Sequence, residues 1–98
     1  MSAYMIVDVE VTDPAGYEEY RTQVPATLEP YQGRFLVRGG AVQVFEGDWP
    51  AQRIVVLEFP SADQAKAWYG SPAYQRILPI RRRCARSKLL LVEGLPPA

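Results

Sequence analysis

Apolar and polar residues alternate at the start of the chain, over residues 3–11. Met5 and Val7 fall on one side of this stretch, and Asp8 and Glu10 fall on the other. A period of two is typical of a strand, because successive side chains point to opposite faces of a sheet. We therefore expect a strand over residues 3–11.

The pattern then changes to steps of three and four residues, the period of an amphipathic helix. Asp13 followed by Pro14 supplies an N-cap and a proline at the first helical position. The apolar stripe continues to Tyr31. Because Pro25 lacks an amide proton and its ring clashes with the preceding turn, we expect a kink or a restart near Val24.

Three more strands and two more helices follow from the same reasoning. Residues 34–38 and 53–59 are expected to form a hairpin. Capping residues at Ser61 and Ser71 predict two consecutive helices, and residues 87–93 form the last strand. The order β-α-β-β-α-β predicts an α+β, ferredoxin-like fold with a four-stranded antiparallel sheet, in which the first and third strands are central.

The length and the strand patterns also predict the assembly. We expect a single ferredoxin-like domain over residues 1–98, with residues 95–98 as a flexible tail. Helices can cover only one face of such a sheet, yet the strands 53–59 and 87–93 carry apolar residues on both faces. A second copy of the chain is the simplest cover for the other face, so we expect a homodimer packed sheet to sheet.

The composition narrows the possible chemistry. The chain has 11 basic and 11 acidic side chains, no histidine and one cysteine. Histidine-dependent catalytic triads, metal sites and haem sites are therefore excluded, and we expect no cofactor and no metal. Asp8 and Glu10 stand where a signal peptide needs apolar residues. We expect a cytoplasmic protein without a membrane partner.

A basic run from Arg81 to Lys88 raises a nucleic-acid hypothesis, since the element order also matches an RNA-recognition motif. The strand 53–59, however, lacks the glycine and the exposed aromatic residues that stack bases, and Glu58 places negative charge there. We therefore expect no nucleic-acid partner. The arginines are interpreted as a solvated helix face, and Cys84 as a small buried side chain.

Several short motifs along the chain resemble one known family. They are VTDPAGYEEY, Gly33–Gly40, Glu46–Trp49, Phe59–Ser61, Trp68–Gln75, Arg81 and LVEG. From Ala3 to Gly94 the chain is similar to the bacterial family DUF1330, of the dimeric α+β barrel superfamily. This family usually has a glycine where the chain has Gln32. The resemblance implies the fold and the dimer, whereas the family itself has no settled activity.

The resemblance also implies a ligand site, because Arg38, Trp68, Tyr74 and Arg81 fall at motif positions and ligands in the superfamily lie between the sheet and its helices. Two guanidiniums and two aromatic rings suit a small planar anion, such as a carboxylate or an enolate. The alternatives stay open: the aromatic residues fit a helix core, and the arginines fit ion pairs with glutamates such as Glu58.

Asp8 and Glu58 are the candidate general bases, because apolar neighbours raise the pKa of a carboxyl group. A structural salt bridge across the dimer seam is the alternative for both. Gly39 and Gly40 predict a bend that re-aims Arg38.

Two functions follow: a cofactor-free enzyme or binder of a planar anion, or a non-catalytic dimerising module. A cavity of about 300 Å³ or more favours the first, and a packed interior the second.

Overall fold

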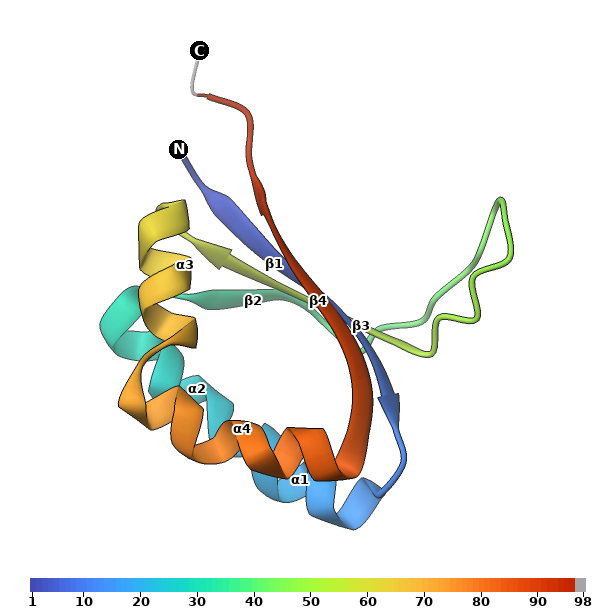
Figure 1. Cartoon of the computed structure of the whole chain (residues 1–98). Coiled ribbons are helices and arrows are strands. Elements are labelled where there is room, and N and C mark those ends of the chain that lie inside the picture. The colour runs from blue at the N-terminus through green and yellow to red at the C-terminus, as the bar shows by residue number, and fades with distance from the viewer. Residues whose placement is uncertain (97–98) are drawn as a thin grey trace.

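A computed structural model describes residues 1–96 and shows two layers, a curved sheet and a set of helices on one of its faces (Figure 1). The four antiparallel strands lie in the order β2-β3-β1-β4. They are β1 (Ala3–Val11), β2 (Arg34–Arg38), β3 (Arg53–Phe59) and β4 (Ala85–Glu93). The helices are α1 (Pro14–Arg21), α2 (Val24–Leu28), α3 (Ala62–Tyr69) and α4 (Pro72–Cys84), with a 3-10 turn at Glu29–Tyr31. The predicted ferredoxin-like α+β fold, with β1 and β3 at the centre, is confirmed.

The helices begin where the sequence places capping residues. Asp13, Ser61 and Ser71 each accept a hydrogen bond from the backbone amide three residues later, at 3.1–3.2 Å. These bonds satisfy amide groups that have no partner within the first helical turn. The first helix ends at Arg21 and α2 begins at Val24, so the predicted break near Pro25 is confirmed.

A bulge in β2 decides which of its side chains face the helices. Phe35 pairs with Leu57, but the next paired residue is Val37, which leaves Leu36 without a partner. One extra residue exchanges the two faces for the rest of the strand. Arg38 consequently faces the helices, together with Phe35.

The glycine pair lies just beyond this strand. Gly39 has a φ of +76°, in the left-handed region, whereas Gly40 does not have a positive φ. A Cβ atom on Gly39 would stand 2.8 Å from Cζ of Arg53, while the surroundings of Gly40 are open. The re-aiming of Arg38 that these glycines predict results instead from the bulge at Leu36, since both glycines come after Arg38 in the chain.

Gln32, which stands where the resemblance leads one to expect glycine, also has a left-handed backbone. Its φ is +57°, and its amide donates to the carbonyl of Glu29 at 3.1 Å. Residues other than glycine, asparagine and aspartate seldom adopt this region, because Cβ crowds the backbone. The chain therefore makes the same turn before β2 with a residue that is less suited to it.

Residues 39–52 form an arm that extends away from the sheet on the side opposite the helices (Figure 1, green). Phe45 in this arm is 90% exposed. One side-chain hydrogen bond ties the arm to β1, where the indole Nε1 of Trp49 donates to Oδ2 of Asp8 at 2.8 Å. The arm is thus held near its end, and its middle is open.

The face of the sheet opposite the helices is largely apolar. Ile6 on β1 lies between Val56 on β3 and Leu90 on β4, and Leu90 and Val92 are 56% and 43% exposed. The expectation of strands with two apolar faces is confirmed for these positions.

Two further findings concern membrane-spanning helices and the predicted C-terminal tail. None of the helices within residues 1–96 combines the length and the apolar composition that a bilayer span requires. The predicted tail over residues 95–98 includes residues 97–98, which lie outside the described residues. Leu95, at its start, is 92% exposed.

Candidate functional site

A cavity lies between the helix-facing side of the sheet and the helices α1 and α4. All four residues that the resemblance places at a ligand site line it, namely Arg38, Trp68, Tyr74 and Arg81. Residues of β1, β3 and β4 form apolar walls. The lining residues contribute hydrocarbon and aromatic surface, phenols and guanidiniums, and none of them carries a carboxylate.

The cavity is narrow in this conformation. About 30 Å³ of it admits a water-sized sphere, which is space for about two water molecules. A preformed pocket for a larger ligand would offer roughly 300 Å³ or more. The interior is therefore nearly filled by its own side chains. By the criterion of free volume alone, this favours the non-catalytic dimerising module, and a ligand larger than a small anion requires lining side chains to move.

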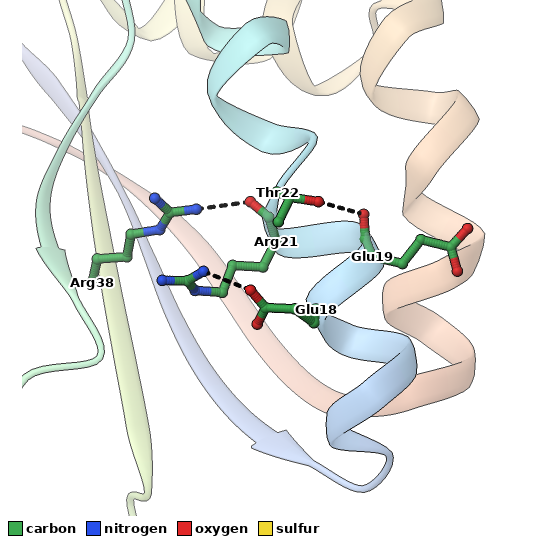
Figure 2. Close-up of polar contacts among 5 residues, drawn as sticks. All are labelled: Glu18, Glu19, Arg21, Thr22 and Arg38. Carbon is green, nitrogen blue, oxygen red and sulfur yellow. Dashed lines mark hydrogen bonds and ion pairs between the residues drawn. The ribbon is translucent and has the colours of Figure 1, made fainter.

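Arg38 spans the mouth of the cavity from β2 to α1. Its Nη2 donates to the backbone carbonyl of Arg21 at 2.7 Å (Figure 2), and its Cζ lies 4.2 Å from the ring centroid of Phe35. The carbonyls at the end of a helix carry partial negative charge, so a guanidinium is favourable there. Arg21 itself pairs with Glu18 at 2.9 Å.

A second guanidinium lies beside Arg38. Arg53 faces the cavity from the start of β3, with its Cζ 5.6 Å from the ring centroid of Tyr17, and its Nε is buried without a hydrogen-bond partner. Burial lowers the pKa of Arg38, and the charges of Arg21 and Arg53 lower it further. Three positive charges therefore crowd the mouth.

Arg81 brings a further guanidinium from the helix layer. Its side chain lies on α4, the residue is only 7% exposed, and its Nε has no hydrogen-bond partner. Within residues 1–96, no carboxylate lies within 4.0 Å of Arg38, Arg53 or Arg81. The structure thus does not form the alternative ion pairs of Arg38 and Arg81. The guanidinium of Arg81 hydrogen-bonds to the neutral phenol of Tyr74 but has no counter-charge. A buried cation without a counter-charge is costly, and an anion that pairs with it relieves this cost.

Two phenols lie next to Arg81. The hydroxyl oxygens of Tyr20 and Tyr74 are 2.8 Å apart. Burial raises the pKa of both side chains, and at Tyr74 the charge of Arg81 and the hydrogen bonds to Tyr20 and Arg81 offset part of this effect. Both phenols therefore remain protonated at neutral pH and act as hydrogen-bond donors rather than as bases.

The indole of Trp68 forms part of the core and part of the cavity wall. Its Nε1 donates to Oγ1 of Thr27 at 3.0 Å, and this hydroxyl donates to the carbonyl of Val24 at 2.7 Å. The ring centroid lies 4.1 Å from that of Tyr74, and Trp68 is 1% exposed. Trp68 and Tyr74 are thus buried core residues, as the alternative interpretation proposed. Only the surface of their rings is left to face a ligand.

The two candidate bases lie outside the cavity lining. Asp8 accepts the hydrogen bond from Trp49, and Glu58 accepts one from Nε of Arg34 at 2.6 Å. The structure therefore brings the four predicted ligand-binding residues together and keeps the two carboxylates apart from them. Glu58 forms a salt bridge with Arg34 of its own chain, so the alternative for this residue, a salt bridge across the dimer seam, stays a prediction.

The sequence reasoning missed four polar residues of the lining, namely Tyr17, Tyr20, Arg21 and Arg53. The alternation of β3 contained the signal for Arg53, because it shares a face with Val55, two residues further along the strand. Tyr20 stood on the apolar stripe of the predicted first helix. The position of Arg21 depends on where α1 ends, which the sequence alone did not indicate.

Comparisons with known proteins agree with this fold. The model of the family described as "Domain of unknown function (DUF1330)" matches residues 2–95, and the chain belongs to this family. No match was found among curated proteins.

Solved structures add neighbours of the same fold. RPA0582 from Rhodopseudomonas palustris, a protein of unknown function, is 18% identical with a TM-score of 0.73, over 98% of this chain and 84% of that one. SnoaB from Streptomyces nogalater, a cofactor-independent oxygenase, is 14% identical with a TM-score of 0.69, over 98% and 95%. A dimeric ferredoxin-like protein of unknown function from Jannaschia sp. CCS1 is 15% identical with a TM-score of 0.70, over 96% and 100%.

Proposed function

We propose that this member of the DUF1330 family binds a small planar anion, a carboxylate or an enolate, in the cavity between its sheet and its helices. One observation carries the proposal: Arg38, Arg53 and Arg81 line a single cavity, and none of them has a carboxylate partner within residues 1–96. A guanidinium forks onto a carboxylate with two parallel hydrogen bonds, which are stronger than bonds between neutral groups.

The other lining groups fit the same class of ligand. One phenol uses its proton in the bond between Tyr20 and Tyr74, so the other hydroxyl proton is left to donate to an oxyanion, and the ring of Trp68 offers an apolar wall against which a planar body can pack. Apolar surroundings strengthen these interactions, because water competes less for the charges. The small free volume favours a compact ligand.

If the site is also catalytic, guanidinium and phenol groups are the polar side chains that line it and can take part in the reaction. Such groups stabilise an enolate or another developing oxyanion, while the absence of a lining carboxylate leaves no general base of that kind. The substrate would therefore arrive as an anion. The cofactor-independent oxygenase SnoaB, a structural neighbour, supports cofactor-free chemistry as a possibility for this chain.

A homodimer is the second part of the proposal, and dimerisation without catalysis is the alternative function. The exposure of Leu90 and Val92 on the helix-free face of the sheet favours a second copy as its cover. The structural neighbour from Jannaschia is a dimeric ferredoxin-like protein, which supports the same assembly here.

Calorimetric titration of the purified protein with small carboxylates tests the binding proposal. We expect binding that weakens by about 1.5–3 kcal/mol in Arg38→Gln, the range for hydrogen bonds to charged groups. Arg34→Gln is the matched control, because Arg34 lies on the same strand and pairs with Glu58 outside the cavity. Equal affinities in both variants would remove Arg38 from the site.

Light scattering at micromolar concentration tests the assembly. We expect a dimer for the natural sequence and a monomer for Leu90→Asp, because a charge in the centre of an apolar interface is left without water or a partner. A monomeric natural protein would contradict the dimer proposal and leave the binding proposal intact.

A further inference from the structure

We infer that the ligand of this cavity is a dicarboxylate, with one acidic group held by Arg81 on the helix side and the other held by Arg38 and Arg53 on the sheet side. This inference rests on the proposed binding of an anion and narrows its ligand class.

The unpaired guanidiniums come from two different layers of the molecule. Arg38 and Arg53 belong to the neighbouring strands β2 and β3, and the charge of Arg53 lowers the pKa of Arg38. Arg81 belongs to α4, where its charge acts on Tyr20 and Tyr74. The cavity therefore has two cationic sides rather than one.

The charge balance requires more than one acidic group. A monocarboxylate compensates the guanidinium that it contacts and leaves the charge on the other side of the cavity unpaired. Arg81 is the more buried of these groups, at 7% exposure; its guanidinium hydrogen-bonds to the neutral phenol of Tyr74, but its Nε lacks a partner and it has no carboxylate to balance its charge. A second carboxylate that reaches Arg81 supplies the missing negative charge, and a buried cation without a counter-charge is strongly unfavourable.

The walls between the two sides define the body of the ligand. They include Val9, Val55 and Leu89, which offer apolar surface and no hydrogen bonds from their side chains. A polar linker would lose its hydration there without compensation. The two acidic groups are therefore joined by a short apolar segment, either a hydrocarbon chain or an aromatic ring.

Entry of such a ligand requires one bond at the mouth to exchange and the lining side chains to move apart, because the cavity has only about 30 Å³ of free space. Arg38 donates to the carbonyl of Arg21 at 2.7 Å and thereby crosses the opening (Figure 2). A carboxylate is a stronger acceptor for a guanidinium than a neutral carbonyl, so the ligand can replace the carbonyl of Arg21. Arg38 is half-buried and Arg21 is 39% exposed at its side chain, which leaves both side chains room to move toward solvent.

Two matched pairs of acids test the inference by calorimetric titration of the intact protein. Glutarate is compared with its monoamide, and terephthalate is compared with its monoamide, so that size is kept and one charge is removed. We expect at least one dianion to bind about tenfold or more tightly than its monoamide, since hydrogen bonds to a charged group exceed those to a neutral one by this amount. In Arg81→Gln, this preference should fall to about twofold or less.

Arg82→Gln is the matched control, because it lies next to Arg81 on the exposed side of α4; it should keep the preference. Circular dichroism and a thermal melt establish that each variant is folded. If Arg81→Gln does not fold, Arg38→Gln against Arg34→Gln measures the same loss of preference from the other side of the cavity.

Three results overturn the inference, and they separate it from the proposal on which it rests. In the first result, a dianion and its monoamide bind equally well and binding still depends on Arg38. This would show that the ligand needs only one acidic group, and the anion site itself would stand. A dianion preference that survives in Arg81→Gln shows that both acidic groups bind at the mouth. Failure of all four acids to bind removes the proposed function as well.

Discussion

The hydroxyl oxygens of Tyr20 and Tyr74 lie 2.8 Å apart, so that a single hydrogen bond joins α1 to α4 inside the wall of the cavity. Both residues are almost fully buried, at 7% and 1% exposure. A hydroxyl that loses its partner in such surroundings keeps the cost of its lost hydration. The two hydroxyls therefore stabilise the fold as a pair, and removing one of them also makes the other unfavourable.

Tyr20→Phe should lower the free energy of unfolding by about 1–3 kcal/mol, because it leaves the hydroxyl of Tyr74 buried without this partner. The double variant Tyr20→Phe/Tyr74→Phe should cost less than the sum of the two single variants. Urea denaturation measures all three, with Tyr31→Phe as a control at a partly exposed tyrosine. Strictly additive losses would show that the hydroxyls do not interact.

The same two phenols predict a loss of stability at alkaline pH. Burial raises the pKa of Tyr20 and Tyr74 in the folded chain, whereas the unfolded chain releases these protons near pH 10, about the ordinary tyrosine value. Above that pH the unfolded state binds fewer protons, so the free energy of unfolding falls as pH rises. The slope is at most about 1.4 kcal/mol per pH unit for each phenol.

Urea denaturation at a series of pH values measures this decline. Tyrosine in an unfolded chain titrates at about pH 10. We expect the contribution of the two tyrosines to the free energy of unfolding to be independent of pH well below this value and to fall above it. The variant with phenylalanine at both positions should decline less steeply than the natural protein. The same slope in both proteins would assign the alkaline loss to other groups.

The glycine pair after β2 should respond unequally to alanine. Gly39→Ala should destabilise the fold by about 1–3 kcal/mol, because a left-handed backbone is unfavourable for alanine and its Cβ would displace the guanidinium of Arg53. Gly40→Ala should be neutral or stabilising by up to about 1 kcal/mol, since its surroundings are open. Thermal melts of the two variants decide the matter, and equal effects would contradict the assigned backbone.

The hydrogen bond from Trp49 to Asp8 should fix the end of the arm of residues 39–52 to β1 and so restrain its motion. Asp8→Ala removes the acceptor, whereas Asp8→Asn keeps an amide oxygen in its place. We therefore expect chymotrypsin to cleave after Phe45 faster in Asp8→Ala than in the natural protein, with Asp8→Asn close to the latter. Equal cleavage of all three proteins would show that this bond does not restrain the arm.

The elements of the fold could be predicted from local signals. Alternation defined β1, β3 and most of β4, and the side chains of Asp13, Ser61 and Ser71 marked where helices begin. Each of these signals acts over a few residues, and each agrees with its neighbours, which makes the pattern readable without tertiary information.

The details of the candidate site depend on contacts that no local pattern contains. Leu36 is as good a strand residue as its neighbours, so nothing in the sequence shows that it is the one without a partner in the ladder. The bond from Arg38 to the carbonyl of Arg21 joins positions 17 residues apart and requires the finished fold. The free volume of the cavity likewise depends on how side chains of both layers pack.

The central place of β1 bears on how the chain is made in the cell. This strand is synthesised first, yet its partners β3 and β4 lie in the second half of the chain. At a rate of about 5–20 residues per second, β1 leaves the ribosome seconds before β4 is complete. Until β4 is complete, one edge of β1 has no partner strand within the chain, and the cavity, whose walls include residues of β1, β3 and β4, cannot close before Leu89 of β4 is in place.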